Sequence, residues 1–339
     1  MKTNRILCGN ALSHLDELPD DSVNLVYLDP PFFANRIFQK KNHEGNSPSF
    51  NDKWVGGISE YISLMHDVFE HSKRLLKDTG SIYVHCDWHA SHYLKVELDK
   101  VFGYDNFRNE IVWKRHNSHN DTKQGARNMG RIHDVILFYS KGKSPTWNPI
   151  YQKYPEEYVK KAYKHLEEKT GRYYAHGDLG GPGGAAKGDP YYTFLGITRY
   201  WRYSEKKMNQ LYKEGKIVQT KPGNMPMLKR YLDEMKGIQL QDIWDDIKPI
   251  QHTRKESTRY PTQKPIKLLE RIISMSTNEK DIVLDAFCGS GTTLVAAHNL
   301  GRRWIGIDQN PEACDIAEKR IQERLESEPI PVKAVAKRN

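Results

Sequence analysis

Four residues near the N-terminus combine hydrogen-bond acceptors with an aromatic ring. Asp29-Pro30-Pro31-Phe32 directly follows an apolar run, residues 23–28, that is typical of a buried strand. The prolines fix φ and remove backbone donors, so the Asp29 carboxylate and the Pro30 carbonyl can face a cavity. Two acceptors beside the face of Phe32 suit a flat ring that carries an amine. Asp-Pro after a strand is also an ordinary turn, so both interpretations stay open for the tetrapeptide alone.

A second candidate binding segment, near the C-terminus, has the pattern of a strand, a glycine loop and a helix start. Residues 281–285 are mostly apolar and end in Asp285. Gly289 and Gly291 allow a tight turn and the close approach of a ligand, while the helix N-terminus presents unpaired N–H groups. Leu294 replaces the third glycine of a dinucleotide fingerprint and the P-loop lysine is absent, so pyrophosphate is the weaker candidate ligand.

Two further features accompany the glycine loop. The apolar residues 303–307 lead to Asp308, which lies 23 residues after Asp285, and an acid at this distance suits ribose hydroxyls. The hexapeptide Tyr260-Pro261-Thr262-Gln263-Lys264-Pro265 stands just before the helix that precedes the loop. The order along the chain is therefore tetrapeptide, long central segment, Pro-Thr-Gln-Lys-Pro and glycine loop.

This order of segments resembles the permuted beta class of N6-adenine and N4-cytosine DNA methyltransferases, over nearly the whole chain. The resemblance implies an α/β fold with a doubly wound mixed sheet, Rossmann-like and circularly permuted, with an inserted DNA-recognition region. The alternation of predicted helices and strands agrees with such a sheet. The resemblance also implies S-adenosyl-L-methionine as cofactor and double-stranded DNA as partner, with a companion restriction endonuclease and a homodimer as further expectations.

The resemblance assigns roles to individual residues. It makes the tetrapeptide residues Asp29, Pro30, Pro31 and Phe32 catalytic. It gives S-adenosyl-L-methionine a site made of Asn10, Thr262, Lys264, Asp285, Phe287, Gly289, Ser290, Gly291, Thr292 and Asp308. Asp308 would take the ribose, and Thr262 and Lys264 would approach the methionine end.

Asn10 departs from the family pattern, which usually has an acid that accepts from the cofactor's adenine amine. The amide oxygen of Asn10 can accept the same hydrogen bond without the charge. The residue can equally cap a helix over residues 11–18. Both interpretations stay open from the sequence.

The expected reaction is direct methyl transfer to the N6 amine of a flipped adenine. Asp29 and the Pro30 carbonyl would accept both amine protons and stabilise the charge that develops on nitrogen, while Phe32 stacks on the base. Adenine is preferred because Asp opens the tetrapeptide more often in the adenine enzymes of the resembled family, whereas Ser is typical of N4-cytosine enzymes. An N4-cytosine enzyme and a catalytically silent DNA-binding protein are the alternatives. The long basic insert argues against a protein glutamine methyltransferase.

The excess positive charge is confined to one segment. Residues 141–255 contain 22 Lys and Arg against 13 Asp and Glu, and 12 of the 19 tyrosines, whereas the remainder has 30 basic and 30 acidic residues. Basic groups neutralise phosphates and aromatic rings stack on bases, so this segment is the predicted target-recognition insert. It separates a catalytic half, residues 1–140, from a cofactor-binding half, residues 256–325, and a tail over residues 326–339. The structural alternative is a solvated lobe whose aromatic residues pack its own core.

Within the insert, residues 156–169 have a helical pattern and the glycine-rich residues 180–188 are predicted to form a loop. Five residues are candidates for contact with the substrate. Trp113 and His133 could sandwich the flipped base, and Arg115 could bind phosphate. Arg199 and Arg202 flank an aromatic cluster in the insert.

No metal site, disulfide or membrane span is expected. The cysteines, Cys8, Cys86, Cys288 and Cys314, form no Cys-x-x-Cys pair, and none follows a proline as the nucleophile of a C5-cytosine methyltransferase would. No apolar stretch approaches the ~18 residues of a membrane span, and the first residues lead into a strand instead of a signal core. We therefore expect a cytoplasmic protein.

Overall fold

A computed structural model of the protein describes residues 1–34, 36–39, 49–116, 127–250, 256–258 and 260–326. The chain divides into two compact units. The first contains Met1–Pro149 and the described residues from Gln241 onward, and the second is Ile150–Leu240. The second unit lies within the predicted insert, whose first and last residues belong to the first unit.

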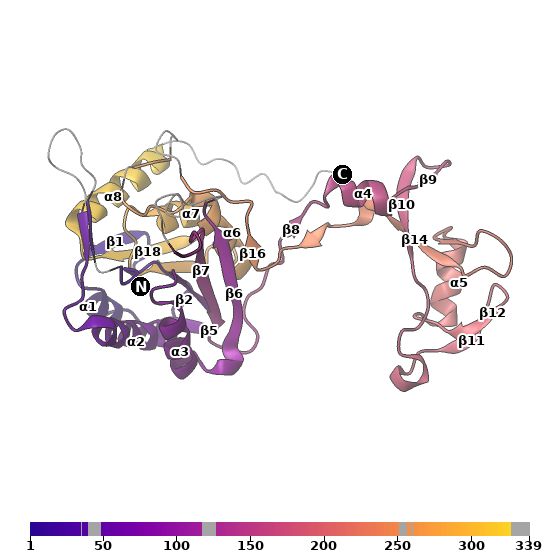
Figure 1. The fold of residues 1–339 in the computed structure, drawn as a ribbon, viewed down its shortest axis with the longest axis horizontal. Helices are drawn as coiled ribbons and strands as arrows, with labels where there is room; N and C mark the ends of the chain where they lie inside the picture. The colour runs from indigo at the N-terminus through magenta and orange to yellow at the C-terminus, as the bar shows by residue number, and fades with distance from the viewer. Residues whose placement is uncertain (35, 40–48, 117–126, 251–255, 259, 327–339) are drawn as a thin grey trace. The chain divides into compact units, whose positions relative to one another are not determined.

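An eight-stranded mixed sheet forms the centre of the first unit (Figure 1). Its strands stand in the order β1 (Arg5–Cys8), β18 (Arg303–Asp308), β17 (Ile282–Asp285), β2 (Val23–Leu28), β5 (Leu76–Cys86), β7 (His133–Ser140), β6 (Phe107–Lys114) and β16 (Ile243–Trp244). Neighbours from β1 to β5 are parallel, β7 runs antiparallel to β5 and β6, and β16 is parallel to β6. The predicted α/β fold with a doubly wound mixed sheet is confirmed.

Helices cover both faces of this sheet (Figure 1). One group contains α1 (Ala11–Asp16), α2 (Gly57–Leu75) and α3 (Ser91–Phe102), followed by the short 3₁₀ helix η1 (Tyr104–Asn106). The other contains α6 (Ile266–Ser276), α7 (Thr292–Asn299) and α8 (Pro311–Glu326). On α2 the fully buried Tyr61, Met65, Val68 and Phe69 recur at helical spacing, so one face of the helix packs into the core.

The pairing of β2 with β17 joins the two predicted chemical segments. Tyr27 lies opposite Asp285 in the register, so the tetrapeptide after β2 and the glycine loop after β17 begin at the same edge of the sheet. The chain leaves β2 for α2 on one face and leaves β17 for α7 on the other, and such a switch point opens a crevice. At the opposite end of the pair, the side-chain oxygen of Asn24 accepts from the backbone N–H of Ile282 at 3.1 Å.

The second unit is made mostly of short antiparallel strands. Its strands are β8 (Tyr151–Gln152), β9 (His165–Glu167), β10 (Arg172–Gly177), β11 (Tyr191–Phe194), β12 (Ile197–Tyr200), β13 (Ile217–Val218), β14 (Met227–Tyr231) and β15 (Ile238–Gln239). Its helical elements are α4 (Glu156–Ala162), η3 (Gly184–Lys187), α5 (Glu205–Lys213) and η4 (Leu232–Glu234). The fully buried Trp201 packs with Phe194 and Met208 in a small core of its own.

One local prediction in the insert was wrong. The helix predicted over residues 156–169 ends at Ala162, and the chain then forms β9, because His165 and Tyr174 pair across β9 and β10 with stacked rings. The loop predicted over residues 180–188 contains the 3₁₀ turn η3. Cross-strand contacts thus overrode the local helical pattern.

A two-stranded hairpin completes the first unit: β3 (Arg36–Gln39) pairs antiparallel with β4 (Ser49–Asp52). Among the described residues no helix combines the length and the apolar composition that crossing a membrane requires.

Candidate functional site

A cavity of about 500 Å³ lies in the first unit, at the edge of the sheet where β1, β18, β17, β2, β5 and β6 end and β7 begins. Most of the predicted site residues line it together. They are Asn10, Asp29, Pro30, Pro31, Phe32, Trp113, Arg115, Thr262, Lys264, Asp285, Phe287, Gly289, Ser290, Thr292 and Asp308. The structure therefore gathers the tetrapeptide, the hexapeptide and the glycine loop around one space.

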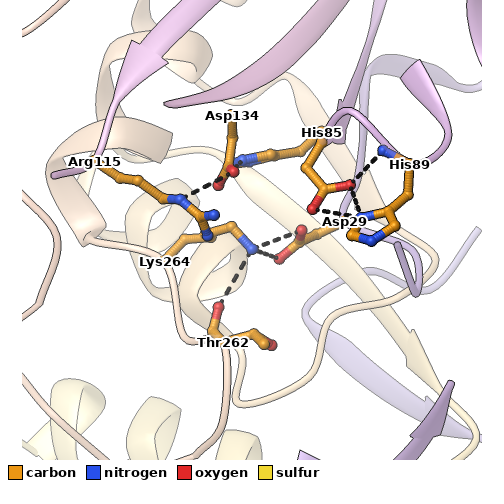
Figure 2. Close-up of polar contacts among 8 residues, drawn as sticks. Asp29, His85, His89, Arg115, Asp134, Thr262 and Lys264 are labelled. Carbon is orange, nitrogen blue, oxygen red and sulfur yellow. Dashed lines mark hydrogen bonds and ion pairs between the residues drawn. The ribbon is translucent and has the colours of Figure 1, made fainter. Parts of the chain in front are cut away.

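Asp29 is bound by a lysine from the distant hexapeptide. The Nζ of Lys264 donates to the two carboxylate oxygens of Asp29 at 2.7 and 2.6 Å (Figure 2). The side chains of Lys264 and Asp29 are 9% and 19% exposed, so the ion pair is largely withdrawn from water. This pair ties the predicted catalytic tetrapeptide to a segment predicted to bind cofactor.

The backbone is strained on both sides of this ion pair. Thr262 has φ +62° and Phe33 has φ +61°, in the left-handed region that bulky and β-branched residues rarely adopt. The carbonyl of Thr262 accepts from Lys264 Nζ at 3.3 Å. Buried Asp52 accepts from the backbone N–H groups of Phe33 and Ala34 at 3.2 and 2.7 Å. Strain of this kind persists where its surroundings fix it, and it clusters at functional sites.

Aromatic rings form one wall of the cavity. The ring of Phe32 stacks on His85 with centroids 5.7 Å apart, and Trp113 meets the same imidazole edge-on at 5.7 Å. Trp113 is 2% exposed, and its indole N–H donates to the carbonyl of Ile247 at 2.7 Å. The wall is thus a fixed surface beside the Asp29 acceptors.

A buried chain of hydrogen bonds orients the imidazole of His85. Its Nδ1 lies 2.8 Å from the hydroxyl of Tyr27, and its Nε2 lies 3.3 Å from Oδ2 of Asp134. Burial, and then the negative charge of Asp29, raises the pKa of Tyr27 well above its ordinary value. The phenol therefore donates to Nδ1, which leaves the Nε2 proton for Asp134.

Arg115 closes the other end of this chain. Its Nε lies 3.2 Å from Oδ1 of Asp134, as an ion pair at the cavity wall (Figure 2). Burial alone would raise the pKa of Asp134, but the hydrogen bond from His85 and the charge of Arg115 hold it below its usual range. The wall thus combines apolar rings with a fixed pair of charges.

The glycine loop needs its glycines for two different reasons. Gly291 has φ +77°, and a Cβ there would lie 2.8 Å from the Cβ of Ala317 on α8. Gly289 has φ +50°, and a Cβ there would lie 3.3 Å from the ring of Tyr260. Gly291 therefore lets the loop pack on α8, whereas Gly289 keeps space beside the cavity open.

Arg320 braces this loop from α8. Its Nη1 donates to the carbonyl and the hydroxyl of Ser290 at 2.5 and 3.2 Å and to the hydroxyl of Thr292 at 3.2 Å. Burial lowers the pKa of Arg320 to about 10. No local sequence pattern predicts this contact, because it joins residues 28 and 30 positions apart.

Two acids face the cavity near the loop. Asp285 is 2% exposed, and burial raises its pKa to about 7 although Thr293 and the N–H of Phe287 donate to it. Burial also raises the pKa of Asp308, whose oxygens accept from the N–H groups of Gly289 and Asn310 at 2.8 and 2.9 Å. Both carboxyls are therefore held in place by backbone N–H groups of the loops that follow β17 and β18.

Asn10 caps α1, which was one of the two roles that the sequence predicted for it. Its Oδ1 accepts from the N–H of Ser13 at 3.2 Å, and the residue also lines the cavity. The same oxygen also accepts from the hydroxyl of Ser13 at 3.5 Å. The structure thus shows the capping role, and the contact with the cofactor's adenine stays a prediction.

The other candidate residues lie outside the cavity lining. Gly291 turns the loop, and His133 is exposed at the first position of β7. Arg199 and Arg202 belong to the second unit. The guanidinium of Arg199 lies 5.7 Å from the ring of Trp201, whereas the side chain of Arg202 is exposed.

Sequence reasoning did not single out four residues of the site: Tyr27, Asp134, Tyr260 and Arg320. Tyr27, Asp134 and Tyr260 adjoin predicted segments, so their position at strand ends or in the hexapeptide was the available signal. In the part of the chain that the structure describes, no three His, Cys, Asp or Glu side chains gather as a metal site.

Three comparisons place these features among known proteins. The family model of DNA methylases of the N6/N4 type matches residues 23–319. The type II methyltransferase M.EcaI of Enterobacter cloacae is 33% identical over 300 residues, which cover 88% of this chain and 64% of the relative. The DNA adenine methyltransferase YhdJ of Escherichia coli K12 is 27% identical over 317 residues, 93% of this chain and 82% of the relative.

Among solved structures, TTHA0409 of Thermus thermophilus, complexed with S-adenosyl-L-methionine, has a TM-score of 0.51 at 18% identity, over 94% of this chain and 93% of that one. This similarity shows the fold. The chain spans less than two thirds of the length of several curated relatives, M.EcaI among them. The family model covers most of the chain and shows that the chain belongs to the DNA methylase family of N6/N4 methyltransferases.

Proposed function

We propose that this chain transfers a methyl group from S-adenosyl-L-methionine to the N6 amine of an adenine extruded from double-stranded DNA. The observation that carries the proposal is the single cavity shared by the tetrapeptide, the hexapeptide and the glycine loop. Its volume of about 500 Å³ lies in the range of small-molecule sites. Acceptors for an amine and a loop for a cofactor therefore meet in one space.

The residues present fit this cofactor. S-adenosyl-L-methionine carries a cationic sulfonium, an ammonium and ribose hydroxyls, and the carboxyls of Asp285 and Asp308 are matching acceptors at the cavity wall. Gly289 leaves open the space that a side chain would fill. When bound, the cofactor supplies an activated methyl group. We assign its binding to the ten residues given above, with Tyr260 added beside Gly289.

The tetrapeptide would act on the amine. Asp29 and the carbonyl of Pro30 accept its two protons, which directs the nitrogen lone pair and stabilises the positive charge that develops there. Phe32, backed by His85, presents a face for the base, and Trp113 and Arg115 border the same space. Because Lys264 already occupies both oxygens of Asp29, the amine must share that carboxylate or displace the ammonium.

Adenine is supported by two observations. The tetrapeptide opens with Asp, which by family resemblance is commoner in adenine enzymes, and the relative YhdJ is named an adenine methyltransferase. The alternative product is N4-methylcytosine, because that amine presents the same two N–H groups. The non-enzyme alternative is a silent DNA-binding protein.

The partner is proposed from charge. The basic insert, with exposed Arg202, would neutralise phosphates of double-stranded DNA, and Arg199 and His133 stay predicted contacts. The target-recognition role of residues 141–255, a companion restriction endonuclease, a homodimer and a cytoplasmic location also stay predictions.

The test is incubation with labelled S-adenosyl-L-methionine and unmethylated genomic DNA, followed by mass spectrometry of the nucleosides. We expect N6-methyladenine, and its loss with Asp29→Ala while cofactor binding persists. N4-methylcytosine would select the alternative. Cofactor binding without a methylated nucleoside, or transfer retained by Asp29→Ala, would contradict the proposal.

A further inference from the structure

Three planar side chains form a stack at the edge of the cavity. Trp88 follows β5 and is 51% exposed. The imidazole of His89 lies 3.7 Å from its ring, centroid to centroid, and the guanidinium carbon of Arg131 lies 3.8 Å from the same ring. Two groups this close to one ring must cover its opposite faces, so the order of the stack is Arg131, Trp88, His89.

The inner end of the stack is fixed to the cavity. Asp87 and His89 both line the cavity. Oδ1 of Asp87 accepts from the backbone N–H of His89 at 2.9 Å. The same oxygen lies 2.8 Å from Nδ1 of the His89 imidazole (Figure 2). The imidazole is therefore held in one orientation, with Trp88 on the side away from the cavity lining.

The outer end is fixed by the strand edge. The carbonyl of Ile132 accepts from the backbone N–H groups of Arg115 and His116 at 2.9 and 3.1 Å, and both of these residues line the cavity. Arg131, the residue before Ile132, is exposed. The stack thus leads from the cavity lining to the protein surface.

The chemistry of this rim suits nucleic acid. Residues 127–133 have exposed side chains at Arg127, Met129, Arg131 and His133, and no acidic residue. Guanidinium groups bind phosphates and stack on bases, and an exposed indole offers a flat apolar surface on which a base can stack. Spacings of 3.7 and 3.8 Å are close to the ~3.4 Å between successive bases in a strand of DNA.

We propose that the stack of Arg131, Trp88 and His89 is a platform beside the extruded nucleotide, on which the exposed Arg131 contacts a base next to the gap that this nucleotide leaves. The inference rests on the proposed function, because the cavity beside the stack is where the extruded base would bind. Unstacking a base costs a few kcal/mol, and a substitute stack would offset part of that cost.

The experiment compares binding to duplexes of randomised sequence with and without one abasic site, by fluorescence anisotropy. The wild-type chain should prefer the abasic duplex, because its gap needs no extrusion. Trp88→Ala should lose about tenfold in affinity for the abasic duplex and most of this preference. Arg131→Lys keeps the positive charge but lacks the planar guanidinium group. This variant should lose the preference for the abasic duplex but keep its affinity for the intact duplex.

Tyr104→Ala is the matched control. Tyr104 is a 73% exposed ring with a cation, Lys95, 5.0 Å from its centroid, and α3 separates it from Trp88 by ~18 Å of helix. It should keep the preference for the abasic duplex. Thermal unfolding checks that Trp88→Ala, a change at a half-exposed position, stays folded.

The outcomes separate the stack from the proposed function. A Trp88→Ala variant that keeps the full preference overturns the stack while leaving methyl transfer untouched. A Trp88-dependent preference without methyl transfer to any DNA overturns the proposed function and supports the stack. If the folded wild-type chain binds neither duplex, both are overturned.

Discussion

Lys264 contacts both carboxylate oxygens of Asp29 across 235 positions of sequence. One of the two acceptors proposed for a target amine, the carboxylate of Asp29, is therefore already engaged by a cation. An ammonium in this position also opposes the positive charge that develops on a methylated nitrogen. In the proposed reaction the amine must therefore share this carboxylate with Lys264 or displace the ammonium.

Replacing Lys264 tests this relationship. Lys264→Met removes the charge and keeps the length, so the carboxylate of Asp29 loses its partner in a largely buried site. We expect a loss of about 1–3 kcal/mol in the free energy of unfolding, because water in the cavity can solvate part of the charge. Urea unfolding measures the loss, and Lys267→Met, an exposed residue of the same helix region, should change little. Equal stability of the two variants would contradict a structural role for the pair.

Asp285 should make stability depend on pH. Its pKa is raised to about 7 in the folded chain from an ordinary value near 3.8, so the folded state holds a proton that the unfolded state has lost between these values. Stability from this group is therefore full below pH ~4 and is lost as pH rises through ~7. Between pH 5 and 7 the wild type should lose about 2 kcal/mol relative to Asp285→Asn in urea unfolding. Parallel pH profiles for the two proteins would show that Asp285 titrates normally.

Arg320 should act on cofactor binding through the loop. Arg320→Met removes three hydrogen bonds to Ser290 and Thr292, so the loop loses its brace without a change at the cavity surface. We expect the dissociation constant for S-adenosyl-L-methionine, measured by calorimetry, to rise about tenfold, which corresponds to ~1.4 kcal/mol. Arg324→Met, at an exposed position of the same helix, is the control. An unchanged dissociation constant in the Arg320→Met variant would show that these hydrogen bonds do not contribute to cofactor binding.

Alanine substitutions at Gly291 and Gly223 distinguish the cost of backbone strain from the cost of a steric clash. Both have positive φ, but a Cβ at Gly291 would lie 2.8 Å from Ala317 whereas a Cβ at Gly223 meets no atom within 4 Å. Gly223→Ala should cost about 1 kcal/mol from strain alone. Gly291→Ala should cost more and weaken cofactor binding, because α8 must shift. Similar costs in urea unfolding would mean that α8 yields easily.

The sequence was sufficient for the fold class and for several strands of the sheet, and most of the predicted site residues line the cavity. Strongly apolar segments such as residues 23–28 and 281–285 are strands in the structure, and each ends at an acid that faces the cavity. Their order, with Pro-Thr-Gln-Lys-Pro between them, supports the family resemblance that implied roles for Asp29, Lys264 and Asp308, and the structure brings the three around one space. Parallel strands that are buried on both faces consist almost entirely of apolar residues, so such continuous apolar runs are a specific sign of a central strand.

What the sequence left out depends on contacts between distant residues. Asp134 and Arg320 act through partners brought near by the sheet and by α8, and neither lies in a pattern of its own. The same applies to the bond between Lys264 and Asp29. In the second unit, residues 163–169 follow their strand neighbours instead of their helical pattern, because short amphipathic segments are decided by tertiary contacts.

The bond between Asn24 and Ile282 spans 258 positions of sequence. During synthesis, at typical rates of ~5–20 residues per second, the ribosome needs roughly 10–50 s to supply β17 after β2 has emerged. Throughout that interval one edge of the central strand has no partner, and an open edge can pair with the wrong chain. The cavity is thus among the last parts of the first unit that can form, and an mRNA truncated before the glycine loop would yield an exposed strand edge and an incomplete cavity.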